Sequence, residues 1–432
     1  MSKLVALIKK TSLLHVWNLA KESPLGIKFR EARGMKRLDQ MFLVEMPAAY
    51  NSERQQPIQE NKVIIIEPRY DFLSNNFQLL YKDLTENYNF DIHIHYLRES
   101  FVPREEFKDN CRTMLKDMAT AKYVFMNEAT RVTSCLDLRP ETIITQLWHG
   151  CGAFKKFGLS TADLIFGASR KSMERHPFNR NYTNVTVSSP EVIWAYEEAM
   201  GLENQKGIVK ATGLSRTDIF FHEEERIKAR TKLEQLMPCA KGKKVILFAP
   251  TFRGRVATAT TPDNLSVEQF AKALGSEYVL LFKHHPVVKE RPTISAALDG
   301  SFAMDMSNHM SIEDLLFVSD ICISDYSSLI FEYSLFERPM LFFAYDLDEY
   351  FDWRGFYYDY DELTPGPICK TNDEMIDYIK NIDTRFDKQQ VIDFKNKFMS
   401  SCDGNATKRI TDLVFGDTLN TYHKRKETVS ND

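Results

Sequence analysis

Residues 324–350, SDYSSLIFEYSLFERPMLFFAYDLDEY, decide the fold class of this chain. They continue the short apolar run DICIS and contain a second run, RPMLFFAYD, with a helix-like apolar pattern between the two. Strands that are apolar along their whole length are buried on both faces, and a helix between two of them is typical of a parallel βαβ unit. The stretch therefore predicts a strand, a turn, a helix and a second strand within an α/β domain.

The same alternation extends along most of the chain. Short apolar runs separated by helix-like stretches are KVIIIEP, FDIHIHYL, AKYVFMN, TIITQLW, KKVILFAP, EYVLLFKHHP and SDICISD. A length of 432 residues exceeds one ordinary domain of about 100–200 residues. We therefore predict two doubly wound α/β domains facing a cleft, with ligands outside the carboxyl ends of the strands. The expected divisions are an N-terminal extension and linker (1–60), a first domain (61–205), a second domain (206–420) and a polar tail (421–432).

The overall composition excludes several classes of protein. A net charge of -4 provides no basic field of the kind that binds nucleic acid. Seven scattered cysteines without a C-x-x-C pair indicate neither a disulfide framework nor a zinc site, and they fit a reducing, cytoplasmic compartment. The sequence contains no run of 18 or more apolar residues, which argues against a helix that spans a membrane.

Residues 1–40 differ from the rest in charge. They contain nine Lys or Arg residues against three acidic ones, and their apolar residues recur at roughly helical spacing around Trp17. A basic amphipathic helix with a tryptophan is typical of an anchor on an anionic membrane surface. The alternative is a helix that packs on the body of the protein, and the pattern is compatible with both.

Polar and cationic side chains follow several of the predicted strands. They are His149, Lys155, Thr251, Arg253, Lys283 and His285. Histidine titrates near neutrality and lysine or arginine can hold anionic oxygens, so these types at one edge of a sheet indicate an anion site with an acid–base group. Such side chains after a single strand could belong to a solvated loop, but here they follow three different strands.

The turn at residues 325–328 adds a second anion-binding feature. Ser327 and Ser328 precede a predicted helix, whose N-terminal N–H groups and partial positive charge stabilise an anion such as a diphosphate. A plain capping turn would need one serine and would leave Asp325 without a role. The acids Asp346 and Asp348 could suggest a metal, but the surplus of cations at the strand ends favours a site without one.

Seven motifs together resemble one known family. They are QLWHGCGAFKKFG, TGLSRTDIFF, ILFAPTFRG, FKHHP, residues 324–350, RGFYYDYDELTPGPI and SSCDGNATKRI, and their order and spacing resemble the CDP-glycerol glycerophosphotransferase family of teichoic acid synthesis. The likeness runs from about residue 60 to residue 416. WHGCGA and TGLSRTD depart from the commoner WHGTP and GYPRND of the family and look closer to its ribitol phosphate branch, so both glycerol and ribitol fit as the polyol.

The resemblance implies a role for each candidate residue. His149 matches the base, and His285 matches a catalytic contact to the donor phosphates. The matched donor-binding positions are Arg253, Lys283, Asp325, Ser327, Ser328 and, more weakly, Glu332 near the ribose. Weaker phosphate or acceptor contacts are Lys155, Arg216 and Thr251.

The resemblance also implies the fold and the reaction. The expected fold is of the GT-B type, with two Rossmann-like domains and neither a metal nor another cofactor. Family members transfer a polyol phosphate from a CDP-polyol to a hydroxyl of an undecaprenyl-diphosphate-linked acceptor and release CMP. The expected enzyme is a peripheral protein on the inner face of the cell membrane, possibly a homo-oligomer, and it adds either one unit or many.

Two other functions remain open at this point. A GT-B glycosyltransferase would use the same fold with a hexose on UDP or GDP as donor. A non-catalytic, membrane-associated assembly factor would use the basic N-terminal segment alone. The charged strand ends argue against the assembly factor, because a scaffold needs no cluster of His149, Arg253 and His285.

Overall fold

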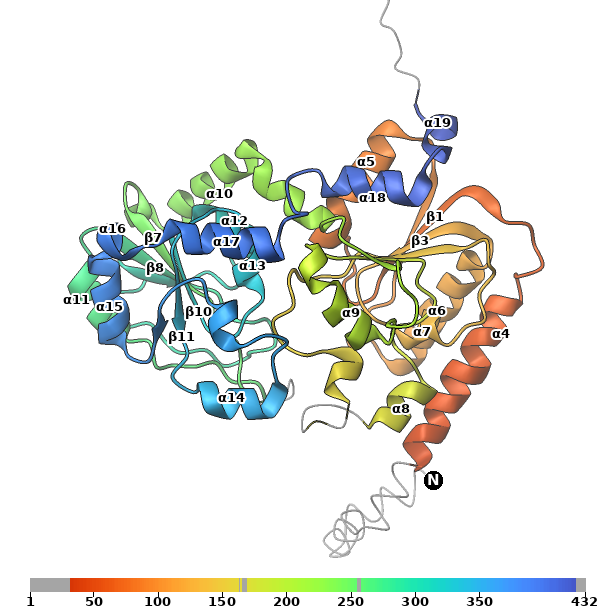
Figure 1. The fold of residues 1–432 in the computed structure, drawn as a ribbon, viewed down its shortest axis with the longest axis horizontal. Coiled ribbons are helices and arrows are strands. Elements are labelled where there is room, and N and C mark those ends of the chain that lie inside the picture. Colours follow the sequence, from red (N-terminus) through yellow and green to blue (C-terminus); the bar gives the residue numbers. More distant parts are fainter. Residues whose placement is uncertain (1–31, 163, 165–168, 255–257, 425–432) are drawn as a thin grey trace, which may run out of the picture.

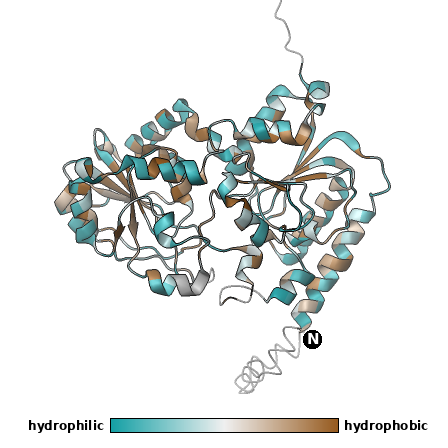
Figure 2. Cartoon of the chain, viewed as in Figure 1, coloured by the Kyte–Doolittle hydropathy of each residue, from teal (hydrophilic) through white to brown (hydrophobic). Residues whose placement is uncertain are grey.

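The computed structural model describes residues 32–424 except 163, 165–168 and 255–257 (Figure 1). The chain forms two α/β units, each built on a six-stranded sheet in which all neighbouring strands pair in parallel. The apolar strands lie at the centre of each unit and the helices around them carry hydrophilic outer faces (Figure 2). The predicted pair of parallel, doubly wound α/β domains is confirmed.

The first sheet has the order β2-β1-β3-β4-β5-β6. Its strands are β1 (Gln59–Glu67), β2 (Asp91–Tyr96), β3 (Ala121–Met126), β4 (Ile143–Gln146), β5 (Asn184–Thr186) and β6 (Val209–Lys210). The helices of this part are α5 (Asn75–Asn87), α6 (Arg104–Met118), α7 (Arg131–Ser134), α8 (Arg170–Arg175) and α9 (Ile193–Met200), with short 3-10 helices η2 (Gly158–Thr161), η3 (Pro190–Val192) and η4 (Ser215–Phe221). Helix α5 buries Phe77, Leu80 and Leu84, whose spacing of three and four residues puts them on one face.

The second sheet has the order β12-β11-β10-β7-β8-β9. Its strands are β7 (Lys244–Phe248), β8 (Tyr278–Phe282), β9 (Ala303–Asp305), β10 (Ile321–Ser324), β11 (Met340–Phe343) and β12 (Ile368–Cys369). Its helices are α10 (Glu223–Leu236), η5 (Pro238–Ala240), α11 (Val267–Leu274), α12 (Ile312–Val318), α13 (Leu329–Ser334), α14 (Leu347–Arg354), η7 (Tyr360–Leu363), α15 (Asn372–Lys380), α16 (Ile382–Arg385) and α17 (Lys388–Phe398). The stretch that decided the fold class is the β10–α13–β11 unit, as its apolar pattern predicts.

The end of the chain returns to the first domain. Helices α18 (Ala406–Phe415) and α19 (Thr418–Tyr422) lie beside α5 in Figure 1. The ring of Phe415 lies 4.4 Å from that of Tyr123 and 4.5 Å from that of Phe90, centroid to centroid. Asp218 accepts hydrogen bonds from the first backbone N–H groups of α18 and so caps it.

Two of the expected divisions differ from this arrangement. Strand β6 extends the first sheet to Lys210, beyond the expected boundary at 205/206. Residues 406–420 were expected in the second domain, but α18 packs on the first one. The physical reason is that the aromatic side of α18 finds its apolar partners on the first sheet, a contact that a linear reading of strands and helices does not contain.

Close backbone contacts join the two domains. Tyr357 N donates to Phe154 O and Lys156 N donates to Gly355 O, each at 3.1 Å. Gly152 has φ +62° and lies against Phe331 of α13, so closely that a Cβ would fall 2.3 Å from the ring. A larger residue would clash there, so the turn after β4 sits directly on the helix after β10.

The N-terminal part is described only from residue 32. The basic segment 1–31, which carries most of the expected anchor helix, lies outside the described residues. The following helical turns, η1 (Asp39–Glu45, a π-helix) and α4 (Met46–Asn51), bury Met46 and Tyr50 against the first domain. Residues 39–51 of the expected extension therefore pack on the protein, and β1 already begins within the expected linker.

Among the described residues, no helix combines the length and the apolar character that a bilayer span requires.

The packing of α18 predicts a large effect of one core substitution. Phe415 is buried, so Phe415→Ala should lower the free energy of unfolding by about 3–5 kcal/mol through lost burial and a cavity. Chemical denaturation followed by circular dichroism measures this loss. Phe101→Ala, at a side chain that is 65% exposed, is the matched control and should change stability by less than about 0.5 kcal/mol. Equal effects of the two variants would contradict the packing of α18 on the first domain.

Candidate active site

A cleft of about 540 Å³ lies between the carboxyl edges of the two sheets. It is lined by His149, Gly150, Lys155, Arg216, Ala249, Pro250, Thr251, Phe252, Lys283, His284, His285, Pro286, Ile312, Ser327, Ser328, Leu329 and Glu332. Most of the candidate residues from the sequence are therefore brought together. Arg253 and Asp325 are the two candidates outside this lining.

His149 lies in a turn whose backbone is held by hydrogen bonds to two side chains. The preceding residue, Trp148, has φ 59°, a left-handed conformation that is unusual for a bulky residue, and its N–H donates to Gln146 Oε1 at 3.0 Å. Arg216 Nη1 donates to the carbonyl oxygen of His149 at 2.7 Å. Strained backbone of this kind is concentrated at functional sites.

The hydrogen bonds of His149 define which ring nitrogen is available. Nδ1 lies 3.1 Å from the carbonyl oxygen of Asn127, and a carbonyl only accepts, so Nδ1 carries the proton. Nε2 then bears the lone pair, and among the described residues none hydrogen-bonds to it. This tautomer is the one that a general base requires.

The pKa of His149 reflects two opposing effects. Desolvation by the surrounding cleft lowers the pKa below its usual value, whereas the carboxylate of Glu128, 3.9 Å from Nδ1, raises it. The net direction is downward, although 43% of the side chain is exposed to the cleft. His149 is therefore neutral near pH 7 and can accept a proton.

His285 has the opposite tautomer on the other side of the cleft. Its Nδ1 accepts a hydrogen bond from Val287 N at 3.3 Å, which leaves the proton on Nε2. Desolvation, followed by the charges of Lys155 and Arg69, lowers its pKa to about 4. The ring is thus neutral at physiological pH and offers an N–H donor to an anion.

Hydroxyl groups complete the anion-binding side. Ser327 and Ser328 form the turn before α13, as the sequence predicts. Thr251 Oγ1 is buried and has no hydrogen-bond partner among the described residues. A buried polar atom without a partner is costly, so a hydroxyl of this kind beside a cleft is a ready contact for a ligand oxygen.

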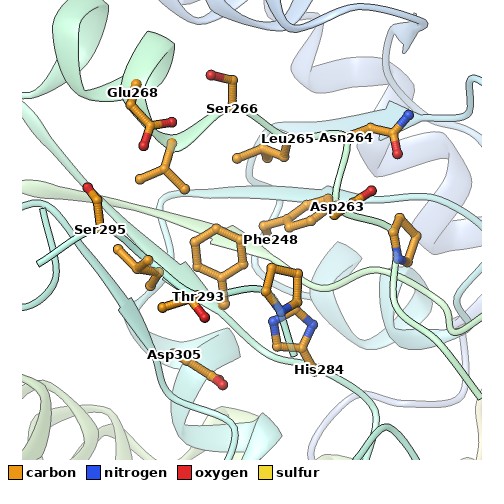
Figure 3. A pocket seen from close by; sticks show the side chains of 15 residues that line it. Phe248, Asp263, Asn264, Leu265, Ser266, Glu268, His284, Thr293, Ser295 and Asp305 are labelled. Carbon is orange, nitrogen blue, oxygen red and sulfur yellow. The ribbon is translucent and has the colours of Figure 1, made fainter. Parts of the chain in front are cut away.

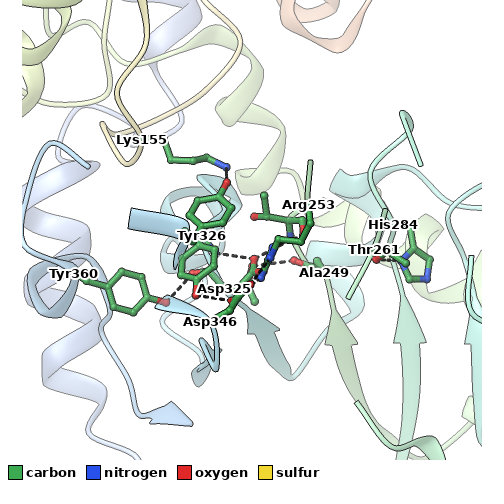
Figure 4. A network of polar contacts seen from close by, with 12 residues as sticks. Lys155, Ala249, Arg253, Thr261, His284, Asp325, Tyr326, Asp346 and Tyr360 are labelled. Carbon is green, nitrogen blue, oxygen red and sulfur yellow. Dashed lines mark hydrogen bonds and ion pairs between the residues drawn. The ribbon is translucent and has the colours of Figure 1, made fainter. Parts of the chain in front are cut away.

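Arg253 and Asp325 belong to a network of polar contacts next to the residues that line the cleft (Figure 4). Both carboxylate oxygens of Asp346 accept hydrogen bonds from the guanidinium of Arg253, at 2.6 and 2.9 Å, and Asp325 Oδ2 lies 3.0 Å from Nη2. Asp325 Oδ1 also accepts from the backbone N–H groups of Thr251 and Tyr326. Direct contact of this pair with the donor stays a prediction, and what the structure shows is that the pair fixes the two loops that line the cleft.

Lys283 and Arg216 line the cleft but are largely occupied by protein partners. Lys283 Nζ donates to the carbonyl oxygens of Ser307 and Met310 at 3.0 and 2.6 Å. Arg216 Nη2 pairs with Glu332 at 2.9 Å and with Glu313 at 3.2 Å. Burial nevertheless raises the pKa of Glu332. The observed contacts of these two cations are with protein groups that line or support the cleft. Their contact with a phosphate remains a prediction.

A second cavity of about 330 Å³ lies on the other side of His284 (Figure 3). Its charged lining consists of Asp263, Glu268 and Asp305, whereas the cleft is lined by Lys155, Arg216 and Lys283 against one acid, Glu332. Carboxylates repel a diphosphate and cations attract it. The sign of the charge thus favours the interdomain cleft over the second cavity for binding an anion.

Two residues at the site, Glu128 and His284, are not among the candidates from the sequence. Glu128 follows β3 by two residues, so the rule that ligands lie beyond the carboxyl ends of strands would have found it. His284 was passed over for its neighbour His285. Its Nδ1 lies 2.9 Å from Thr261 Oγ1, and it separates the two cavities.

The part of the chain that the structure describes contains no group of three or more His, Cys, Asp or Glu residues placed to hold a metal ion. Asp346, one of the acids that could suggest a metal, is bonded to Arg253 instead. The expectation of a reaction without a metal stays a prediction.

Taken together, the cleft offers a neutral base on one side and an anion site on the other. His149 Nε2 can remove a proton from a hydroxyl that enters from the first domain. His285 Nε2–H, Thr251 and the serine turn can hold phosphate oxygens on the second domain. This division suits transfer of a phosphorus-centred group to a hydroxyl, in which positioning and charge stabilisation are the main contributions.

Known proteins resemble this chain in sequence and in structure. The teichoic acid poly(ribitol-phosphate) polymerase of Bacillus spizizenii is 37% identical over 85% of this chain, which spans 58% of that protein. The ribitol-phosphate polymerase TarK of Staphylococcus aureus is 35% identical over 79% of this chain and 66% of its own length. The teichoic acid ribitol-phosphate primase of B. spizizenii is 32% identical over 83% of this chain and 92% of its own length.

Among solved structures, the wall teichoic acid polymerase TagF shares the fold. Its TM-score is 0.69 at 21% identity, over 91% of this chain and 98% of the TagF chain. The GT-B-like architecture expected from the sequence is thereby confirmed. The family model described as CDP-glycerol:poly(glycerophosphate) glycerophosphotransferase matches residues 48–416. Because that match covers most of its length, the chain belongs to the CDP-glycerol:poly(glycerophosphate) glycerophosphotransferase family.

Proposed function

We propose that this protein transfers a polyol phosphate from a CDP-polyol to a hydroxyl of a teichoic acid chain or its lipid-linked precursor, with release of CMP. The observation that carries the proposal is the pair of neutral histidines with opposite tautomers, His149 and His285, on the two sides of one cleft. Family membership supports the same reaction class.

The proposed step follows from the placement of these groups. His149 Nε2 takes the proton of the acceptor hydroxyl while the hydroxyl oxygen attacks the phosphorus that carries the polyol. The new oxygen–phosphorus bond forms as the bridging bond of the diphosphate breaks, and CMP leaves with the electron pair. His285 Nε2–H and the hydroxyls of Thr251 and Ser327 are placed to stabilise the negative charge on the phosphates.

Ribitol phosphate is the proposed unit. The relatives named as ribitol-phosphate enzymes are 32–37% identical to this chain, whereas those named as glycerol-phosphate enzymes are 27–31% identical. The motif variants around His149 and Arg216 point in the same direction.

We also propose that the enzyme works at the inner face of the membrane. A lipid-linked acceptor such as one on undecaprenyl diphosphate would keep it there, and the surplus of basic residues in 1–40 supports binding to an anionic surface. A homo-oligomer is compatible with this proposal.

Donor binding tests the proposed function directly. A CDP-polyol at about 100 times its dissociation constant should stabilise the native state by about 2.7 kcal/mol, a shift of several degrees in Tm. Thermal unfolding with CDP-ribitol, CDP-glycerol, CDP and a UDP-hexose measures this. We expect the largest shift with CDP-ribitol. A response to the UDP-hexose alone would favour the rival glycosyltransferase function, and no response to any nucleotide would favour the assembly factor.

The base assignment predicts a specific loss in His149→Ala. The variant should release CMP about 100–10,000 times more slowly, because a positioned base contributes a factor of this size. Its thermal shift with CDP-ribitol should stay close to that of the wild type, since His149 does not belong to the proposed phosphate site. His285→Ala is the comparison and should lose rate and donor-induced stabilisation together. Near-normal CMP release by His149→Ala would refute the assignment.

The position of Glu128 next to His149 predicts an effect on the pH dependence of activity. Activity should rise with pH as His149 loses its proton, and the negative charge of Glu128 raises the pKa of His149. Glu128→Gln removes this charge, so the pKa should fall and the acidic limb of kcat/KM should move to lower pH. Asp137→Asn, at an exposed carboxylate near the amino edge of the same sheet, is the control and should leave the limb in place. A shift to higher pH in Glu128→Gln would contradict the electrostatic role.

A further inference from the structure

Several loops lie next to that of His149 along the carboxyl edge of the first sheet. The order β2-β1-β3-β4 places the loops after β4, β3 and β1 side by side, and they carry His149, Glu128 and Arg69 in that sequence. Because neighbouring strands lie about 4.8 Å apart, the β1 loop begins roughly 10 Å from the β4 loop. The row therefore leads away from the reacting position along one edge of the first domain.

Arg69 is linked electrostatically to both histidines of the cleft. Its Nη2 lies 2.9 Å from Glu128 Oε2, and the other oxygen of Glu128 lies 3.9 Å from His149 Nδ1. The positive charge of Arg69 lowers the pKa of His149 and that of His285. Its side chain is 56% exposed, so the guanidinium is accessible to a ligand.

Exposed aromatic rings lie next to Arg69. Tyr70 and Phe72 stack with their centroids 4.9 Å apart, and they are 42% and 55% exposed. The loop after β2 is hydrogen-bonded to the loop that carries these two rings, since Glu99 N donates to Pro68 O at 2.7 Å. In that loop Arg98 and Ser100 have φ values of 58° and 71°, a left-handed backbone that is concentrated at functional sites. Solvent-exposed aromatic rings in such loops are typical of a binding surface.

We propose that Arg69, with the stacked pair Tyr70 and Phe72, binds the acceptor chain. In this proposal the guanidinium holds the phosphodiester next to the polyol whose hydroxyl reacts at His149, and the two rings cover the carbon chain beyond it. The inference rests on the proposed function and deepens it, because it defines the acceptor as an anionic polyol-phosphate chain and gives it a path.

Charge and geometry favour this occupant. A guanidinium presents a planar fork of N–H donors that matches a phosphodiester, and the match is stronger than that of an ammonium. The ion pair with Glu128 is no obstacle, because partly exposed ion pairs contribute little to stability. A phosphodiester can therefore share or replace this partner when the acceptor enters.

The test compares two soluble acceptors that end in the same polyol, one with a phosphodiester at the next position and one without. CMP release from CDP-ribitol is measured at about pH 8.5, where His149 is neutral in every variant. Arg69→Gln should raise KM for the phosphodiester acceptor at least tenfold and KM for the neutral acceptor less than twofold. The KM for CDP-ribitol should stay unchanged.

Arg54→Gln is the matched control. Arg54 also pairs with a carboxylate of the first domain, Asp137 at 3.1 Å, but it precedes β1 and so lies at the opposite edge of the sheet. This variant should leave both KM values within twofold. Phe72→Ala should raise KM for the phosphodiester acceptor without a change in CDP-induced stabilisation.

Three outcomes would overturn the inference. They are an equal rise of KM for both acceptors in Arg69→Gln, an unchanged KM for the phosphodiester acceptor, and loss of binding to anionic vesicles as the only defect. The last would show that the patch contacts a membrane. Failure of the proposed function itself looks different, because the wild-type protein would then release no CMP from any CDP-polyol.

Discussion

The buried pairing of Arg253 with Asp325 and Asp346 is the interaction on which the second domain's side of the cleft depends. A buried charge is tolerated only with partners, and removal of one member of such a group leaves an uncompensated charge at a cost of about 3–5 kcal/mol. Here Asp325 also accepts the N–H groups of Thr251 and Tyr326, so one carboxylate ties the loop after β7 to the turn after β10. Those strands are neighbours in the sheet, and their loops supply Thr251 and Ser327 to the cleft.

The first domain fixes its own side by different means. His149 is held through its main chain by Arg216 and through its ring by the carbonyl of Asn127. Arg216 in turn pairs with Glu332 of α13, so the position of His149 is coupled to the helix that follows the serine turn. The two histidines are both neutral, but Nε2 of His149 bears a lone pair whereas Nε2 of His285 bears a proton. The site can thus accept a proton on one side and stabilise an anion on the other.

Contacts between the domains explain why certain motifs have their form. Gly152 allows the WHGCG turn to lie against Phe331, and Gly213, with φ +80°, comes so close to the segment before α18 that a Cβ would be 2.1 Å from Ser401 O. These glycines appear in the sequence as small residues near a candidate site. In the structure Gly152 lets the turn after β4 approach α13 of the second domain, and Gly213 lets the loop after β6 approach the segment before α18.

The sequence by itself determined the fold class, the two parallel sheets and most of the cleft lining. These follow from local patterns, since fully apolar runs define buried strands and strand ends define where polar residues gather. The turn before α13 is an example in which a short motif specifies its own structure. The resemblance of the motifs to a known family also required only order and spacing along the chain.

Only the tertiary structure decided which of these residues face the cleft and which stand behind it. Arg253 and Asp325 are indistinguishable from ligand contacts in the sequence, but Asp346, far along the chain, occupies the guanidinium. Glu128 and Arg69 gain importance only because strand order places them beside His149. The return of α18 to the first domain likewise depends on aromatic partners such as Tyr123. The physical reason is common to all three, since charge pairing and packing act between residues that are distant in sequence and leave no local pattern.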